Sequence, residues 1–218
     1  MFTGRSITLK GYVHIVEKPR SLVIGVDEAG RGPLAGPVVS TAVIIKEKID
    51  GVKDSKCLSA VRREALFNLI VNKAIAFGIG VASPKEIDNL NILKATLLSM
   101  KRAIESLNLN YFERYGEFIK EARVFVDGNK IIPEVKFHQK AVIGGDRKIY
   151  EISAASIVAK VTRDRMMKSF SKKYPVYAFE RHKGYATPLH REMIKKYGIS
   201  EIHRRSFLKK LNEENSLW

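Results

Sequence analysis

The chain has 218 residues, of which 45% are hydrophobic and 28% charged, so its composition is that of a globular protein and not of a disordered or fibrous one. Lysine and arginine number 39 against 23 acidic residues, and the net charge of +16 argues against an acidic binding module and favours a polyanionic partner, nucleic acid before a membrane surface. The single cysteine excludes an intrachain disulfide, and no run of 18 apolar residues predicts a transmembrane helix. We expect a cytoplasmic protein without a signal peptide. Nothing in the sequence indicates an oligomer, so we also expect a monomer.

In chain order, short apolar runs alternate with amphipathic stretches, which favours the α/β class. Strands are predicted at residues 22–26, 37–45, 74–81, 122–126 and 141–143. Helices are predicted at residues 61–71, 92–107, 149–170, 188–197 and 206–213. The short connection between the first two strands suits antiparallel pairing, whereas the long helical connections between the first and fourth strands suit parallel neighbours.

Basic residues concentrate towards the C-terminus. Residues 161–218 carry 14 lysines and arginines and 6 acidic residues, which is half of the net charge in about a quarter of the chain. Aromatic residues interleave with them, at Phe170, Tyr174, Tyr177, Phe179, Tyr185, Tyr197 and Phe207. Bases stack on aromatic rings and phosphates attract lysine and arginine, so the region suits a nucleic-acid groove. Taken singly, most of these aromatics are expected in a core and most of these charges on solvated helix faces.

Acidic residues follow three of the predicted strands. Asp27 and Glu28 follow the first strand, Asp127 follows the fourth, and Asp146 comes shortly after the fifth. Parallel strands place their carboxyl ends at one edge of the sheet, where open α/β sheets bind their ligands. One aspartate at a strand end is as easily a turn residue or a helix cap, but the three together favour a site.

Carboxylates held close together repel each other, and a divalent cation removes that conflict. Oxygen ligands select Mg²⁺ or Mn²⁺ over zinc, and no cysteine and histidine spacing competes. Because phosphate oxygens commonly complete Mg²⁺ sites, the acids of this basic protein indicate metal-dependent phosphoryl chemistry.

Asp27 and Glu28 are adjacent, so in a regular strand their side chains would point to opposite faces. Both serve one site only if the backbone turns there, and Gly30, Gly32 and Pro33 make such a turn plausible. Glycines around Arg31 also let backbone amides approach a ligand closely. The segment is not a P-loop, because no Gly-Lys-Ser/Thr follows.

Several segments resemble, in order, the motifs of ribonuclease HII, the bacterial type 2 ribonuclease H. They are Gly-Val-Asp-Glu-Ala-Gly-Arg-Gly-Pro at 25–33, Asp-Ser-Lys at 54–56 with Leu-Ser at 58–59, Glu-Ile-Asp-Asn-Leu-Asn-Ile-Leu at 86–93, Val-Asp-Gly-Asn at 126–129, Gly-Asp at 145–146, Ser-Ala-Ala-Ser-Ile-Val-Ala-Lys-Val-Thr-Arg-Asp at 153–164, His-Lys-Gly-Tyr at 182–185 and His-Arg-Arg-Ser-Phe at 203–207. They span nearly the whole chain, and the ordered set is specific where one motif alone would be weak. The related ribonuclease HIII usually has lysine where Arg31 stands.

The resemblance implies a ribonuclease H-like fold, a mixed five-stranded sheet flanked by helices with a helical C-terminal extension. We therefore predict an N-terminal extension at 1–21, a catalytic domain at 22–170 and a basic helical region at 171–218. The resemblance implies hydrolysis of the RNA strand of RNA–DNA hybrids and cleavage at single ribonucleotides embedded in duplex DNA, leaving a 3′-hydroxyl and a 5′-phosphate.

The resemblance also assigns roles to the acids. Asp27, Glu28, Asp127 and Asp146 match the family's metal-binding and catalytic acids, with Asp27 bridging two Mg²⁺ or Mn²⁺ ions. In a two-metal displacement one ion lowers the pKa of the attacking water and the other stabilises the departing oxygen, so no histidine or cysteine is needed as a base.

Substrate-binding residues carry over in the same way. The family senses the 2′-hydroxyl, which is both donor and acceptor, with the backbone that matches Gly30, Arg31 and Gly32. Tyr185 matches a tyrosine that packs on the sugar beyond the ribonucleotide, although on residues alone it reads as an ordinary aromatic. Two lysines, Lys56 and Lys183, are equally expected to contact phosphates or to be solvated. Cys57 stands where the family commonly has lysine, which puts a phosphate contact in doubt but not catalysis.

One inference comes from spacing. If a helix begins just after Asp146, then Ser153, Ser156, Lys160 and Asp164 lie on one stripe that starts beside the acids. We predict that Ser153 or Lys160 touches the scissile strand or orients a metal ligand, and that Ser156 serves helix packing.

Two other functions remain open from the sequence. A non-catalytic basic module that binds structured nucleic acid would explain the charge but would leave the four acids without a role. A Mg²⁺-dependent phosphatase of small molecules would use the acids, but its activity would be insensitive to salt.

Overall fold

The computed structural model describes residues 22–52 and 58–209. These residues form a five-stranded sheet in the order β3-β2-β1-β4-β5. The strands are β1 (Val23–Ala29), β2 (Val38–Ile45), β3 (Ala74–Ala82), β4 (Arg123–Asp127) and β5 (His138–Val142). The helices are α1 (Ala60–Lys73), α2 (Pro84–Leu90), α3 (Ile92–Tyr115), α4 (Gly145–Lys148), α5 (Tyr150–Lys173), the 3-10 helix η2 (Pro175–Tyr177), α6 (Phe179–His182) and α7 (Pro188–Tyr197).

The sheet is mixed, as predicted. β1 pairs antiparallel with β2, and β2 pairs antiparallel with β3. On its other side β1 runs parallel to β4, and β4 runs parallel to β5. The register joins Val26 of β1 to Val126 of β4, so the next residues of the two strands, Asp27 and Asp127, come side by side.

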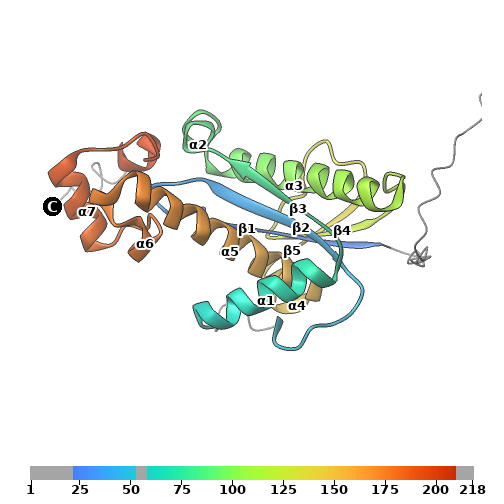
Figure 1. The fold of residues 1–218 in the computed structure, drawn as a ribbon. Coiled ribbons are helices and arrows are strands. Elements are labelled where there is room, and N and C mark those ends of the chain that lie inside the picture. The colour runs from blue at the N-terminus through green and yellow to red at the C-terminus, as the bar shows by residue number, and fades with distance from the viewer. Residues whose placement is uncertain (1–21, 53–57, 210–218) are drawn as a thin grey trace, which may run out of the picture.

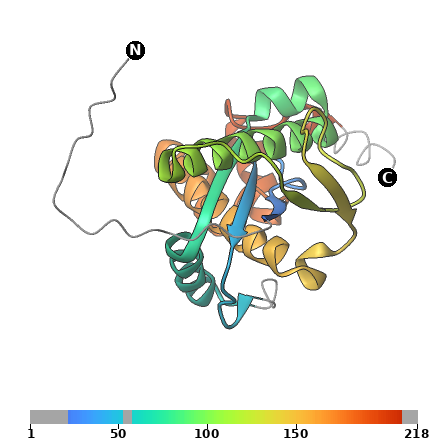
Figure 2. The ribbon, with the colours of Figure 1, turned by 90° about the vertical axis from the view of Figure 1, so that its right-hand side faces the viewer.

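Helices cover both faces of the sheet (Figures 1 and 2). One apolar cluster joins α3 to side chains of β1, β2, β3 and β4, and a second joins α1 and α5 to the opposite face. Glycine permits the closest approaches. A Cβ on Gly80 of β3 would lie 2.0 Å from the Ser99 carbonyl oxygen of α3, and one on Gly25 of β1 would lie 2.1 Å from the Glu151 carbonyl carbon of α5. Because these two glycines have no side chain, α3 can lie directly against β3 and α5 directly against β1.

The C-terminal elements pack at the far end of α5, away from the sheet (Figure 1). Their apolar cluster contains Ala35 from the loop after β1 and Met167 from α5, together with Tyr177, Phe179 and Ile202. The predicted domain boundary at residue 170 falls inside α5, which runs unbroken to Lys173. The predicted extension at 1–21 lies outside the described residues. In the described part of the chain, no helix has both the length and the apolar character that a membrane crossing requires.

The predicted elements are present, with shifted ends. The helix predicted at 188–197 has those bounds, whereas α3 continues to Tyr115, where Gly116 with φ 72° ends it. The helix α2 was not predicted, although Ser83 and Glu86 form a capping box around Pro84. Of the helix predicted at 206–213, residues 206–209 are helical, in a segment that begins at 205, and the rest lies outside the described residues.

Candidate active site

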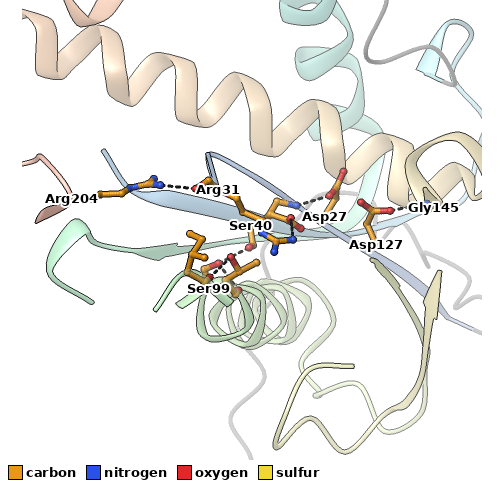
Figure 3. Close-up of polar contacts among 10 residues, drawn as sticks. Asp27, Arg31, Ser40, Ser99, Asp127, Gly145 and Arg204 are labelled. Carbon is orange, nitrogen blue, oxygen red and sulfur yellow. Dashed lines mark hydrogen bonds and ion pairs between the residues drawn. The ribbon is translucent and has the colours of Figure 1, made fainter. Parts of the chain in front are cut away.

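The acids predicted to share one site come from β1, β4 and the short helix α4. Asp127 is the last residue of β4, and its Oδ1 accepts a hydrogen bond from the Gly145 amide at 2.7 Å. Asp27 lies beside it on β1, with its Oδ1 accepting from the Glu28 amide at 2.7 Å. Figure 3 shows the Asp27 and Asp127 carboxylates next to each other beneath α5. The residue after Gly145 is Asp146, whose side chain is buried.

The first strand does not turn at the acids, which corrects the expectation from sequence. β1 continues to Ala29, because Glu28 and Ala29 pair in register with Ser40 and Val39 of β2. Asp27 therefore faces α5, where the Ser156 hydroxyl donates to its carboxylate. Glu28 faces α3 and lines a cavity of about 30 Å³ together with Asp127 and residues 128–130. Asp127, at the end of its strand, lies near both acids, and its charge raises the pKa of Asp27 and of Glu28, so the three carboxylates come close together although the strand does not turn.

Burial and the repulsion of neighbouring carboxylates raise the pKa values of Asp27 and Glu28. Burial raises the pKa of Asp27 well above its usual value, and the charges of Glu28 and Asp127 raise it further. Burial also raises the pKa of Glu28, although the Arg31 guanidinium, 3.4 Å from Glu28 Oε1, opposes that effect. The carboxylates of Asp27, Glu28 and Asp127 therefore have too little positive charge near them to offset their repulsion.

The donor set fits a divalent cation. Glu28 Oε2 is buried and has no hydrogen-bond donor among the described residues, and a hard cation would satisfy it. Among residues 22–52 and 58–209, no group of three acidic, histidine or cysteine side chains has a geometry that could already hold a metal ion. Asp27 and Asp127 each accept one backbone amide through Oδ1, which leaves Oδ2 of each carboxylate available to a cation.

Ser153 connects α5 to the acid-bearing segment. Its hydroxyl lies 2.5 Å from the Asp146 carbonyl oxygen and 3.1 Å from that of Ile149, and it donates to them. It therefore touches the main chain of one predicted ligand, while Ser156, predicted to serve packing, touches the carboxylate of another, Asp27. Lys160 instead forms an ion pair with Asp164 at 2.7 Å.

The glycine-rich loop and Tyr185 lie close together. A Cβ on Gly32 would lie 3.8 Å from Tyr185 Cε1, and the Tyr185 side chain is half-exposed. The Lys183 ammonium donates to the Glu180 carbonyl oxygen, and Lys56 lies outside the described residues.

Two residues that sequence reasoning did not single out, Arg163 and Arg204, are buried against the main chain of this loop. Both occur in the motifs that match the family, but residue type and spacing do not show that an arginine is buried.

A larger cavity lies away from the acids. It measures about 390 Å³ and is lined by residues at the opposite ends of the strands, among them Leu22, Arg123 and His138. It contains none of the predicted site residues.

The mixed sheet, the acids at its carboxyl edge and the helices on both faces define an enzyme with the ribonuclease H fold. The sequence model of ribonuclease HII matches residues 24–210. A ribonuclease HII of Caldicellulosiruptor bescii is 51% identical over 191 residues, which are 87% of each chain. A crystal structure of ribonuclease H2 from Pyrococcus horikoshii superposes with a TM-score of 0.67 at 32% identity, covering 88% of this chain and 98% of that one. Bst-RNase HIII, solved in complex with Mn²⁺, shares the fold with a TM-score of 0.59 at 19% identity, covering 82% of this chain and 63% of that one.

The chain belongs to the ribonuclease HII family. It is a metal-dependent endoribonuclease of the ribonuclease H type, and the family acts on RNA–DNA hybrids.

Proposed function

We propose that this enzyme cuts the RNA strand of RNA–DNA hybrids and also cuts at single ribonucleotides embedded in duplex DNA, leaving a 3′-hydroxyl and a 5′-phosphate. The observation that supports this most directly is the grouping of Asp27, Glu28 and Asp127 at one edge of the sheet, with Asp146 next to the amide that binds Asp127. We also propose that it acts in the cytoplasm, as is typical of the family.

The four acids would hold two divalent ions, Mg²⁺ or Mn²⁺. When bound, these ions would activate the attacking water and stabilise the charge on the departing oxygen. The protein's own part is to keep the carboxylates ionised and facing the substrate. Ser156 helps, because its hydrogen bond to Asp27 favours the charged form and lowers the pKa that burial raises.

The loop at residues 30–32 and Tyr185 would recognise the substrate. Gly32 has room in front of it, since apart from its chain neighbours the described residues place only Tyr185 Cε1 within 4 Å of its Cβ position, so a sugar can approach the backbone closely. The exposed ring of Tyr185 is available to pack against the neighbouring sugar.

The variant Asp127→Asn tests the assignment of the acids. Its amide oxygen can still accept the hydrogen bond from Gly145, so the fold should persist while a metal ligand is lost. We expect cleavage of a duplex with one embedded ribonucleotide to fall by at least about 100-fold in Mg²⁺ and in Mn²⁺. Binding of the same duplex, measured in Ca²⁺, should persist.

Asp50→Asn is the matched control, because it removes the same charge from an exposed position. Unchanged cleavage by Asp127→Asn would refute the assignment and leave a non-catalytic nucleic-acid module. Rising salt should weaken binding, because phosphate contacts release counterions, and a phosphatase of small molecules would show no such dependence.

A further inference from the structure

Two buried arginines hold the main chain of the loop at residues 30–37. Arg204 donates to three carbonyl oxygens of this loop, those of Gly30 at 2.6 Å, Arg31 at 2.9 Å and Gly36 at 2.9 Å. Arg163 of α5 donates to the carbonyl oxygens of Pro37 at 2.9 Å, Lys183 at 3.0 Å and Ala35 at 3.1 Å. Arg204 and Arg163 are 0% and 1% exposed, respectively, and four of the six hydrogen bonds are fully buried, so water competes little for them.

These hydrogen bonds are strong because their donors are charged and desolvated. Among the described residues neither Arg163 nor Arg204 forms an ion pair, so the main-chain carbonyl groups are their hydrogen-bond partners. Bonds from a charged donor are about twice as strong as neutral ones, and leaving a buried charge without partners is costly. The carbonyl groups therefore cannot turn away from the arginines without a large penalty.

The held carbonyl groups fix the direction of the amides that face the substrate. In a trans peptide the C=O of one residue and the N–H of the next point in opposite directions. Because Arg204 holds the carbonyl groups of Gly30 and Arg31, the amides of Arg31 and Gly32 point away from Arg204. Figure 3 shows Arg204 bound to Arg31 on the side away from Asp27 and Asp127.

The same arginines connect the loop to Tyr185. Arg163 binds the Lys183 carbonyl oxygen, and the Leu34 amide donates to the Gly184 carbonyl oxygen at 2.8 Å. Close packing leaves no room for a side chain on Gly184, where a Cβ would lie 2.5 Å from the Ala35 carbonyl oxygen. The backbone of the loop at residues 30–37 and the ring of Tyr185, which would contact neighbouring sugars, are thus parts of one rigid unit.

A carboxylate at the base of this unit fixes Arg204 in turn. Asp88 of α2 accepts hydrogen bonds from the amides of Arg205 and Ser206, each at 2.9 Å, and from the Ser206 hydroxyl at 2.6 Å. The main chain next to Arg204 is therefore tied to α2.

We propose that Arg204, supported by Arg163, is a positioning residue that sets the enzyme's selectivity for ribonucleotides by orienting the Arg31 and Gly32 amides. The inference rests on the proposed function, since it concerns how the same loop recognises the 2′-hydroxyl. Arg204 itself does not touch the substrate.

The test compares Arg204→Lys with Arg205→Lys, its neighbour whose side chain is exposed. Both variants keep their charge, but a lysine at position 204 cannot hold three carbonyl groups with the geometry of a guanidinium. The quantity measured, in Ca²⁺, is the ratio of affinities for a duplex with one embedded ribonucleotide and for the all-DNA duplex of the same sequence. We expect Arg204→Lys to lower this ratio about tenfold, with the all-DNA affinity and the Arg205→Lys ratio unchanged.

A ratio separates positioning from stability, because partial unfolding lowers both affinities by the same factor. If Arg204→Lys yields no folded protein, Arg163→Lys decides, with Arg165→Lys on the same helix as its control. A ratio that stays at the wild-type value in the folded variant overturns the inference. If the wild-type enzyme itself does not distinguish the two duplexes, the proposed function fails and takes this inference with it.

Discussion

Three glycines of the loop after β1 differ in how much space an added methyl group would have. A Cβ on Gly30 would lie 2.0 Å from Arg163 Nε, and one on Gly36 would lie 2.4 Å from Met167 Sδ. Both residues also have a positive φ, which alanine rarely adopts. Gly32 has neither constraint, since its Cβ position meets only Tyr185 Cε1 at 3.8 Å. Packing among residues 22–52 and 58–209 gives no reason for glycine at position 32, which is consistent with close approach by a ligand there.

The variant Gly32→Ala should therefore separate folding from function. We expect its free energy of unfolding to stay within about 0.5 kcal/mol of wild type, as for a surface substitution. Cleavage should fall at least about tenfold, because the methyl group would occupy the space in which the sugar meets the backbone. Urea unfolding and cleavage of the single-ribonucleotide duplex measure the two effects.

Gly30→Ala is the comparison, because the same methyl group would there displace Arg163. It should destabilise the protein by about 1–3 kcal/mol as well as reduce cleavage. Full activity of Gly32→Ala would show that the loop does not approach the substrate closely.

At the scale of single residues, the sequence predicted the acids better than their surroundings. Asp27 and Asp127 could be placed side by side because each follows an apolar run, and the long connections with helices between those runs predict parallel strands. The direction of the Glu28 side chain could not be predicted, because it depends on how far β2 continues to pair. Arg163 and Arg204 could not be recognised, because residue type does not distinguish a buried arginine from a solvated one.

At the scale of elements, the sequence predicted the bounds of α7 and of β3 closely, but those of the edge strand β5 less well. The bounds of α7 agree with prediction, because Thr187 caps the helix before Pro188 and Gly198 ends it. The strand β5 begins three residues earlier than predicted, since His138, Gln139 and Lys140 are polar. These residues pair with β4 on one side only, at the edge of the sheet, where polar residues are acceptable and apolar patterning is weak.

The packing of α3 on β3 leads to a prediction about stability. A Cβ on Gly80 would lie 2.0 Å from the Ser99 carbonyl oxygen and 2.5 Å from the Ala103 amide nitrogen, both backbone atoms of α3. Gly80→Ala must therefore move the helix or the strand, and it would strain the buried Ser40–Ser99 hydrogen bond of 2.6 Å. We expect a loss of about 1–3 kcal/mol in the free energy of unfolding, measured in urea.

Gly32→Ala serves as the control here as well, because it adds the same methyl group without a backbone clash. Equal stabilities of Gly80→Ala and Gly32→Ala would mean that α3 does not approach β3 as closely as the structure shows.

At the scale of the whole molecule, the C-terminal elements are held together by three buried histidines. His190 Nδ1 lies 2.9 Å from the Tyr185 carbonyl oxygen and so must donate, which leaves Nε2 to accept from His203 Nε2 at 3.0 Å. His203 Nδ1 then accepts from the Ser200 amide. His182 donates to a carbonyl oxygen with one nitrogen and accepts from an amide with the other. All three rings are therefore neutral in the folded protein.

This network should make stability fall in mild acid. Burial lowers the pKa of His190 and of His203 from 6.5 to about 4. Between those pH values the unfolded chain binds protons that the folded chain does not, so acidification favours unfolding, by at most about 3 kcal/mol for each histidine. The raised pKa values of Asp27 and Glu28 act in the opposite direction, because protonation in the folded state removes the cost of burying their charges and relieves their repulsion.

A variant of one histidine separates these contributions. Urea unfolding between pH 7 and pH 4 should show a smaller loss of stability for His190→Gln than for wild type, because glutamine does not titrate, while the acids remain the same in both proteins. His138→Gln, at an exposed position, should follow the wild-type curve. If His190→Gln loses stability as steeply as wild type, the buried histidines do not set the acid limit of the fold, and protonation elsewhere must do so.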